Sequence, residues 1–322
     1  MPPTADLQTV TLGPGGPTVP ALGVGTWAWG DSLFWDYGKA YSDSDLQAAF
    51  DACLEAGLTL FDTAEVYGLG ESERLIGRFM QQRPSQAVIA TKYFPLPWRF
   101  SPQSVADALT ASLERLQVAS VALYQVHWPL DFLLSQQDLM RALAAAVKQG
   151  RIGAVGVSNY SAQQMRAAHG YLAEQGVPLA ANQVQYSLLH RKPETNGVID
   201  TARELGVTIL AYSPLAQGLL TGKYRPEANL KPAGARWLDP RFSPAGLTKL
   251  LPVIEALETI GQGRDRTPAQ VALNWLVAQG NVLPIPGAKN ARQATQNAGA
   301  LGWALTPDEL AQLSQLTQRY RP

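Results

Sequence analysis

LTLFDT, residues 58–63, is a short apolar run that ends in a carboxylate, Asp62. The same pattern recurs in AVIATK at 87–92 and VALYQVHW at 121–128, which end in Lys92 and His127. Five similar runs are ALGVGTW at 21–27, IGAVGVSN at 152–159, LAANQVQYS at 179–187, VTILAYS at 207–213 and VLPIPG at 282–287. Short apolar, β-branched runs bounded by turn residues indicate buried strands. The sequence therefore predicts eight strands.

Segments with helical periodicity separate these runs. After the first run, Ser44 and Gln47 match a capping box and open a predicted amphipathic helix. Another predicted helix covers Ser101 to Leu116, with Pro102 at its first position. Polar residues at successive strand ends are 25 to 35 residues apart, from Asp62 to Tyr212. This spacing fits repeated strand–helix–strand crossovers.

The spacing breaks once, between the seventh and eighth runs. The Pro/Gly-rich stretch Leu215 to Leu247 predicts a long functional loop after the seventh strand, followed by a final barrel helix at Thr267 to Ala278. At the N-terminus, residues 10–12 and 18–20 flank Gly-Pro-Gly-Gly and predict a hairpin that closes the bottom of a barrel. Thr306 to Tyr320 predicts an appended C-terminal helix.

A doubly wound sheet would also alternate strands and helices. Its nucleotide-binding form carries G-x-G-x-x-G after the first strand, and neither GVGTWAWG nor GLGESE matches that motif. Polar or glycine residues instead end nearly every strand, and a barrel gathers all these ends on one face. We therefore predict a single (β/α)8 TIM barrel that occupies residues 1–322 as one domain.

Charge and composition exclude several classes of function. Lys plus Arg and Asp plus Glu are both 26, so no net field attracts nucleic acid or an anionic membrane. The start, MPPTADLQTV, lacks the pattern of a targeting segment, and no apolar stretch is long enough to span a membrane. The one cysteine, Cys53, cannot form an internal disulfide and is expected in the core. These features predict a cytoplasmic protein.

Four residues near the strand ends suit carbonyl reduction. A carbonyl that receives a hydride needs a proton on its oxygen, and Tyr67, in DTAEVYG, is a candidate donor. Lys92 would lower the pKa of this phenol, Asp62 would keep the lysine charged, and His127 would orient the carbonyl oxygen or join the relay. Each has an ordinary alternative: a structural ion pair, a surface tyrosine and a core histidine.

Taken together, DTAEVYG, ATKY, YQVHWP, GVSNY, NQVQYS, AYSPLAQGLLTGKY and IPGAKNARQATQNAG resemble the motifs of the aldo-keto reductases, in order and at fitting spacing. The resemblance covers almost the whole chain. The motifs are most similar to those of plastid and cyanobacterial, pyridoxal-reductase-like members of the family. It implies a catalytic tetrad of Asp62, Tyr67, Lys92 and His127, with Tyr67 as general acid. It also implies NADPH in an extended pose across the barrel mouth.

The resemblance places cofactor contacts along the strand ends. Ser158, Asn159 and Gln183 would hold the nicotinamide carboxamide, and Tyr212 would stack on the ring. The remaining implied contacts, toward the ribose, pyrophosphate and adenosine, are Thr26, Trp27, Asp62, Ser213, Pro214, Leu215, Ala216, Gln217, Gly218, Lys223, Arg236, Gly287, Lys289, Gln293, Gln296 and Asn297. Many relatives have Glu where Gln296 stands, so the chain departs from the family pattern at this position.

NADPH carries a phosphate on its adenosine ribose, which must be met by cations or donors. Lys289 follows the last strand just before a helix, where its ammonium and the helix's N–H groups can converge on that phosphate. No Asp or Glu occurs from Gly287 to Leu305, so nothing there would repel it. The alternative is that Lys289 is an ordinary solvated lysine.

The expected substrate is a small-molecule carbonyl bound by Trp27, Tyr67, His127 and Trp128. Other aromatic residues that could line an aromatic pocket or only pack the loops are Trp29, Phe34, Trp35, Tyr37, Tyr93, Phe94, Trp98 and Tyr160. A second hypothesis is a cofactor-binding regulatory subunit like the potassium-channel β subunits, which an exposed apolar patch or a fourfold assembly would favour. A metal-dependent hydrolase is disfavoured because only three histidines occur, none at ligand spacing, so no metal is expected.

Overall fold

The computed structural model describes residues 7–83, 87–132, 134–228, 230, 232 and 234–322. Residues 1–6, on which the expected absence of a targeting segment partly rests, lie outside this set. Within the described part of the chain, none of the helices has both the length and the apolar character needed to cross a membrane.

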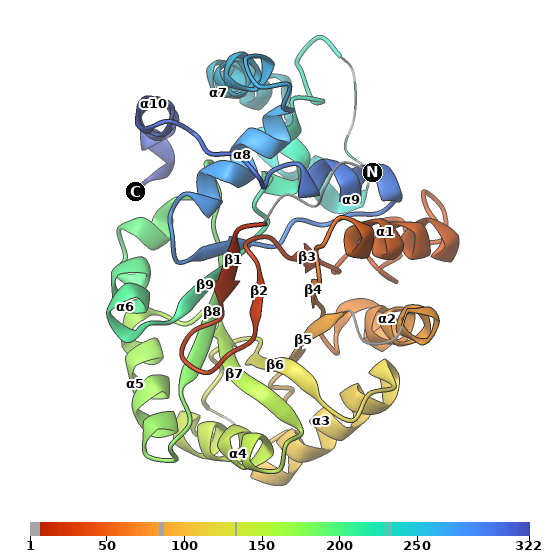
Figure 1. Ribbon diagram of the computed structural model, residues 1–322, viewed down its shortest axis with the longest axis vertical. Helices are drawn as coiled ribbons and strands as arrows, with labels where there is room; N and C mark the ends of the chain where they lie inside the picture. The colour runs from red at the N-terminus through yellow and green to blue at the C-terminus, as the bar shows by residue number, and fades with distance from the viewer. Residues whose placement is uncertain (1–6, 84–86, 133, 229, 231, 233) are drawn as a thin grey trace.

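The central element is a closed ring of eight parallel strands in chain order (Figure 1). Backbone N–H groups of Gly23 and Gly25 donate to the carbonyls of Pro284 and Pro286, both at 3.0 Å, and join the first strand to the last. A Cβ on Gly25 would lie 2.7 Å from the carbonyl oxygen of Ile285, so this seam requires glycine. The strands are β3 (Val24–Gly25), β4 (Leu60–Asp62), β5 (Val88–Tyr93), β6 (Val121–Val126), β7 (Ile152–Ser158), β8 (Leu179–Gln185), β9 (Thr208–Tyr212) and β10 (Val282–Pro284). The predicted TIM barrel is confirmed.

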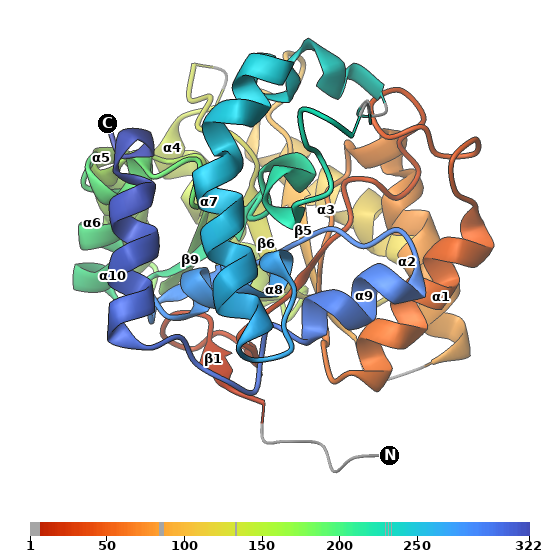
Figure 2. The same ribbon diagram turned by 90° about the horizontal axis from the view of Figure 1, so that it is seen from above.

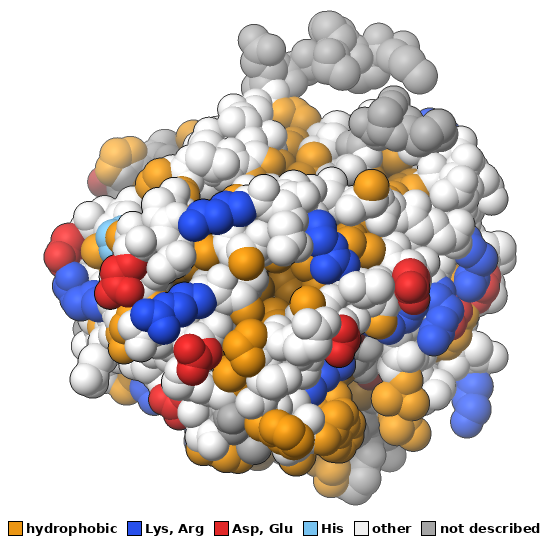
Figure 3. All heavy atoms as spheres, turned by 90° about the horizontal axis from the view of Figure 1, so that it is seen from below, with side chains coloured by type: hydrophobic (Ala, Val, Ile, Leu, Met, Phe, Trp, Pro, Cys, Tyr) orange, Lys and Arg blue, Asp and Glu red, His pale blue; other side chains and the backbone are white. Residues whose placement is uncertain are grey.

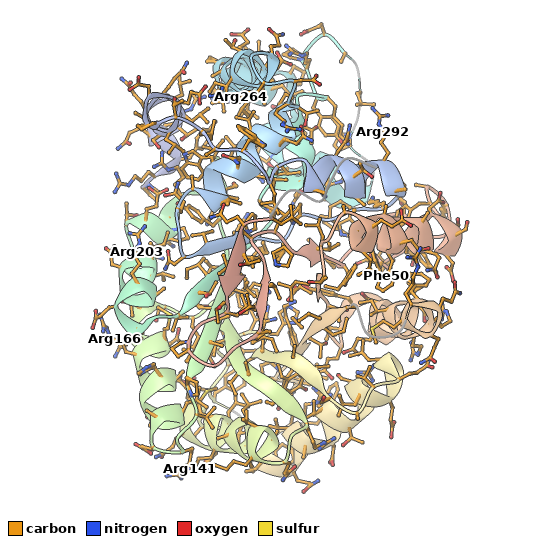
Figure 4. The ribbon with its side chains drawn as sticks, viewed as in Figure 1. Phe50, Arg141, Arg166, Arg203, Arg264 and Arg292 are labelled. Carbon is orange, nitrogen blue, oxygen red and sulfur yellow. The ribbon has the colours of Figure 1, made fainter. Side chains whose placement is uncertain are left out.

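Helices surround this ring. Phe50 points from its helix toward the strands, whereas Arg141, Arg166 and Arg203 lie at the periphery of the molecule (Figure 4). Cys53 is fully buried in the same core, as expected. The helices are α1 (Asp43–Glu55), α2 (Glu71–Gln82), α3 (Pro102–Leu116), α4 (Gln136–Lys148), α5 (Ala162–Ala173), α6 (Val198–Leu205), α7 (Pro244–Gln262), α8 (Pro268–Val277), α9 (Ala291–Ala298) and α10 (Pro307–Leu316).

Two of three expectations about helices need correction. The N-cap of α1 is Ser42, not Ser44, because the carboxylate of Asp45 accepts from the Ser42 backbone N–H at 2.9 Å. The predicted helix at Thr267 to Ala278 is confirmed as α8, and α9, which follows the last strand as expected, packs against α1. The long insertion is only partly a loop, since it contains short 3-10 turns and ends in the 19-residue helix α7.

The interior of the barrel has an apolar and a polar layer. Because side chains alternate along a strand, each lumen residue is followed two positions later by another. Leu60, Ala90, Leu123 and Ala181 belong to a fully buried apolar cluster, and the residues two positions on are Asp62, Lys92, Gln125 and Gln183. The predicted hairpin, β1 (Thr9–Thr11) and β2 (Thr18–Pro20), seals the apolar end with Leu12 and Val19. Figure 2 shows this hairpin at one end of the barrel and the long loops at the other.

The C-terminal helix is fastened to the barrel by one buried guanidinium. Arg191, 4% exposed, binds Glu194 with two hydrogen bonds of 2.6 and 2.7 Å. It also donates to the Ser314 carbonyl at 2.7 Å and to the Thr317 hydroxyl at 3.0 Å. Its guanidinium lies 5.2 Å from the centre of the Trp275 ring.

We expect Arg191→Ala to lower the free energy of unfolding by about 3–5 kcal/mol, because it removes one partner of a buried ion pair. Urea unfolding at neutral pH measures this loss. The matched control is Arg203→Ala, whose pair with Asp200 is exposed and long at 3.7 Å, so its loss should stay below about 1 kcal/mol. Similar losses in both variants would contradict the anchoring role of Arg191.

Candidate active site

The polar layer of the lumen centres on a buried ion pair. Asp62 ends β4 and Lys92 lies on β5, and their side chains are 2% and 0% exposed. Lys92 Nζ donates to Asp62 Oδ1 at 2.5 Å, to the Thr63 carbonyl at 2.8 Å and to the Tyr67 hydroxyl at 3.3 Å. An ammonium has three N–H donors, so all three are used. The phenol oxygen of Tyr67 is therefore an acceptor here, and its own O–H is free to donate elsewhere.

The charged state of Lys92 is secured by its neighbours. Burial alone lowers the pKa of Lys92, but attraction to Asp62 and the oxygen of Tyr67 outweighs it, and the pKa lies above its usual value. The expectation that Asp62 keeps the lysine protonated therefore agrees with the pKa direction.

The pKa of Tyr67 differs from the expectation of a lowered value. Burial raises it, the Lys92 ammonium lowers it and the Asp62 carboxylate raises it, and the net direction is upward. The main reason is the burial of the phenol, and the Asp62 carboxylate, 2.5 Å from the ammonium, opposes the lowering effect of Lys92. Tyr67 thus keeps its proton at neutral pH, and Lys92 limits the cost of losing it.

His127 follows β6, and its ring meets the edge of the Tyr67 ring at a centroid distance of 5.7 Å. Burial, and then repulsion from Lys92, lowers the pKa of His127 to about 3. At neutral pH the imidazole is therefore uncharged and can both donate and accept a hydrogen bond. Among the described residues, no group pairs with its buried Nδ1.

One residue of this cluster was missed by the sequence reasoning. Gln125 of β6 is fully buried, and its Nε2 donates to Asp62 Oδ2 at 2.8 Å. Gln183 of β8 donates to the same oxygen at 2.8 Å and to Gln125 Oε1 at 3.1 Å. The available signal was the polar residue inside the apolar run VALYQVHW, two positions before His127 and so on the same face.

The expected carboxamide-binding residues lie together at the ends of β7, β8 and β9. Ser158 Oγ donates to the Gln183 carbonyl at 3.0 Å, and Asn159 Nδ2 donates to Ser158 Oγ at 3.1 Å. The Tyr212 hydroxyl donates to Asn159 Oδ1 at 3.1 Å. Asn159 has φ of 62°, a left-handed conformation that re-aims its side chain across the mouth.

Residues 213–218, expected at the pyrophosphate, form a tight turn. Ser213, Ala216, Gln217 and Gly218 all have left-handed φ, between 47° and 100°. Pro214 and Ala216 are buried, and Leu215 is half-buried. Within the turn, the N–H groups of Ala216 and Gly218 donate to the carbonyls of Ser213 and Leu215 at 2.9 and 3.0 Å.

Three cations lie near this turn. Arg236 is buried, donates to the Gln217 carbonyl at 3.2 Å and lies 4.9 Å from the centre of the Trp35 ring. Lys289 lies 4.6 and 4.5 Å from the ring centres of Trp35 and Tyr41. Burial, followed by repulsion from Arg236 and Lys223, lowers the pKa of Lys289 to about 8. The three positive charges form one electrostatic cluster.

The Lys289 ammonium lies against the loop that precedes α1. Its Nζ donates to the Trp35 carbonyl at 3.3 Å, and the N-cap of α9 is the side chain of Asn290. The reason is that two aromatic faces of the loop before α1 hold the ammonium there.

The expected adenosine contacts support the turn after β10. Gln293 Oε1 accepts from the Lys289 N–H at 2.9 Å, and Asn297 Nδ2 donates to the Gly287 carbonyl at 3.2 Å. Gln296 is half-buried, and its carbonyl accepts from Gln270 at 2.8 Å. The side chains of Gln293 and Asn297 therefore stabilise this turn.

The first strand end contributes a buried hydroxyl and an aromatic cluster. Thr26 is fully buried, and its Oγ1 donates to the Asp62 carbonyl at 2.9 Å. Trp27, 37% exposed, stacks on Phe34 at 4.9 Å and lies 6.5 Å from the Tyr67 ring. Trp128, also at the mouth, is 44% exposed.

Three aromatic residues considered for the pocket are core residues instead. Trp29, Tyr93 and Tyr160 are at most 3% exposed, and Trp29 Nε1 donates to the Ala288 carbonyl at 2.8 Å. Their rings fill the layer between strands and helices.

The large apolar side chains that are exposed share one location. Every one of them in the described chain lies in a segment that follows the C-terminal end of a barrel strand. This mouth rim consists of Trp27, Leu33, Leu69, Trp98, Phe100, Trp128, Phe132, Leu230 and Leu238. Figure 3 shows hydrophobic side chains gathered at the lower edge of that view, the mouth end of the barrel.

The arrangement can donate a proton to an oxygen at the barrel mouth. Tyr67 presents its O–H, a neutral imidazole lies beside it, and the buried ammonium stabilises the phenolate left by proton transfer. Among the described residues, no group of His, Cys, Asp or Glu side chains could hold a metal ion.

Comparison with known proteins gives the family. The aldo/keto reductase family model matches residues 21–318. Chloroplastic pyridoxal reductase from Arabidopsis thaliana is 42% identical over 318 residues, which cover 95% of this chain and 85% of the relative. A glycerol dehydrogenase structure from Gluconobacter oxydans is 28% identical with a TM-score of 0.83 and covers 99% of this chain and 98% of its own. An aldo-keto reductase from Klebsiella pneumoniae in complex with NADPH is 28% identical with a TM-score of 0.77, covering 98% and 96%. The chain therefore belongs to the aldo/keto reductase family.

Proposed function

We propose that this protein reduces an aldehyde or ketone to an alcohol with NADPH, and that Tyr67 supplies the proton. The observation that carries this proposal is the use of all three Lys92 N–H groups, one of them on the phenol oxygen of Tyr67. That bond leaves the phenol proton to point at a substrate oxygen and stabilises the phenolate that forms. Asp62 keeps Lys92 charged, and neutral His127 donates or accepts one hydrogen bond at the same oxygen.

The residues present fit NADPH. Lys289, Arg236 and Lys223 form a cation cluster near the 213–218 turn, and burial and repulsion from the other two cations lower the pKa of Lys289 against the attraction of Asp36 and Asp31. At the other end, the amide nitrogen of Gln183 is engaged, while none of the described residues donates to its Oε1. When bound, NADPH supplies the hydride that reaches the carbonyl carbon. Ser158, Asn159, Gln183 and the 213–218 turn would hold it.

The mouth rim favours a carbonyl attached to an apolar or aromatic ring. Trp27 and Trp128 expose faces beside Tyr67 and His127, which are suited to stacking against a flat ring. The Arabidopsis relative is a pyridoxal reductase, so pyridoxal belongs in the first substrate screen. Because the exposed apolar surface surrounds the same opening, we propose that it serves substrate entry instead of a separate regulatory partner.

Location and domain organisation follow as parts of the same proposal. A cytoplasmic location is supported by the single, fully buried cysteine, Cys53. The entire chain acting as one domain is supported by the seam between the first and last barrel strands and by the fastening of α10 through Arg191. We propose no nucleic-acid or membrane partner, in keeping with the balanced charge.

We expect Tyr67→Phe to lower kcat for aldehyde reduction by roughly 10²–10⁴-fold, because the ring stays and only the acid is lost. NADPH binding, measured by fluorescence titration, should be unchanged. Tyr171→Phe on α5 is the matched control and should keep the wild-type kcat. Wild-type turnover in Tyr67→Phe would remove Tyr67 from the mechanism.

We expect Lys289→Ala to weaken NADPH binding by about 1.5–3 kcal/mol, the range for a hydrogen bond to a charged group, with little change for NADH. Fluorescence titration of both cofactors at fixed ionic strength measures the difference. Lys148→Ala, at the distant end of α4, controls for the loss of a charge alone. Equal weakening of NADPH and NADH would show that Lys289 does not bind the 2′-phosphate.

The preference for NADPH over NADH should fall as the pH rises through about 8, because the ammonium of Lys289, whose pKa is about 8, then loses its proton. The ribose phosphate is dianionic above pH 7, so its own charge stays constant. From the standard linkage relation we expect the Kd for NADPH to rise roughly tenfold between pH 7 and 9. In Lys289→Ala this dependence should vanish; its persistence there would assign it to another group.

A further inference from the structure

Gln125 has no role in the tetrad, yet it occupies the centre of the polar layer. It is fully buried, and each end of its amide has a specific partner. The nitrogen donates to Asp62 Oδ2 at 2.8 Å, and the oxygen accepts from Gln183 Nε2 at 3.1 Å. One side chain therefore joins the carboxylate that holds Lys92 to the glutamine that would hold the carboxamide.

The barrel makes room for this side chain at a particular place. Gly156 on β7 pairs in register with Gln125 on β6. A Cβ on Gly156 would lie 2.8 Å from Gln125 Cγ and 3.3 Å from Leu123 Cδ1. Because β7 lies between β6 and β8, the missing side chain lets Gln125 reach past β7 to Gln183. Gly156 thus permits a contact between two strands that are not neighbours.

The charge at Asp62 depends on the same contact. Its Oδ1 accepts from Lys92, and its Oδ2 accepts from the two amides of Gln125 and Gln183. Hydrogen bonds to a buried carboxylate disperse its negative charge. Without the Gln125 amide, more of the negative charge of Asp62 would face Lys92 and neutralise it more fully. The positive field of Lys92, which helps Tyr67 to ionise, would then weaken.

We propose that Gln125 is a positioning residue: it holds the side chains of Gln183 and Asp62 in fixed positions relative to each other. One buried side chain thereby aligns the carboxamide of the cofactor with the proton donor Tyr67. This inference rests on the proposed reductase function. Gln125 does not touch the reacting atoms, and it acts through Gln183 at the cofactor and through Asp62 and Lys92 at Tyr67. Gly156 is part of the same arrangement.

The test uses Gln125→Met, which keeps the length of the side chain and removes both hydrogen-bonding groups. The Kd for NADPH should rise roughly three- to tenfold, as for the loss of a neutral hydrogen bond. The Kd for adenosine 2′,5′-bisphosphate, which carries the phosphate but no nicotinamide, should not change. In alcohol oxidation, Tyr67 must accept a proton and therefore has to be ionised first. Because the variant weakens the field of Lys92, the pH at which the oxidation rate is half-maximal should move upward.

Two further variants distinguish positioning from stability. Gly156→Ala leaves the chemistry of Gln125 intact but displaces it, and should shift both readouts in the same directions. Asn274→Leu removes another buried amide, which donates to the Ala300 and Trp303 carbonyls away from the lumen. It should lower the free energy of unfolding and leave the cofactor affinities and the pH profile unchanged.

The outcomes separate this inference from the function on which it rests. A wild-type protein that neither binds NADPH nor reduces any aldehyde would overturn the proposed function, and the role of Gln125 with it. An active wild type with wild-type affinities and pH profile in both Gln125→Met and Gly156→Ala would overturn only the role of Gln125. Equal weakening of NADPH and the bisphosphate would also overturn it, because the effect would then not be at the nicotinamide end.

Discussion

The buried carboxylate of Asp62 is the group on which the arrangement of the barrel mouth depends. A charge in the lumen of a barrel is stable only when it is paired and hydrogen-bonded, and Asp62 receives an ammonium and two amides there. These donors come from β5, β6 and β8, so one residue on β4 organises the interior across half of the ring. Removal of a donor would alter both the packing of the lumen and the charge seen by Tyr67.

In the proposed reaction, the same pairing would keep Lys92 protonated, so that it assists Tyr67 and does not act as a base. Lys92 is fully buried, a location that favours the neutral amine, and the carboxylate reverses this preference. The compensated ammonium has a weaker field, and the pKa of Tyr67 stays above its usual value. A phenol in this state holds its proton until an acceptor arrives, which suits a general acid that must not leak protons to water.

The two ends of the barrel mouth differ in how their charges are arranged. Around Tyr67 the charges are paired, and the groups that remain for a ligand are neutral: a phenol, an imidazole and amide oxygens. Around Lys289 the ammonium lies on two aromatic faces, and repulsion from Arg236 and Lys223 opposes the attraction of Asp36 and Asp31. A ligand that fits both ends needs a neutral, reactive head and an anionic tail, and NADPH has this division of charge.

The sequence by itself determined the barrel and the hairpin and placed Asp62, Tyr67, Lys92 and His127 at neighbouring strand ends, because strand periodicity and strand-end chemistry are local properties. It placed the start of α1 two residues late, since alternating Ser and Asp offer two caps. Only the tertiary structure decided that Gln125 meets Gln183, that Lys289 lies on Trp35, and that Tyr93 and Tyr160 are core residues. These contacts join segments far apart in the chain, and the extent of desolvation, which sets the pKa of Tyr67, depends on every element packed around it.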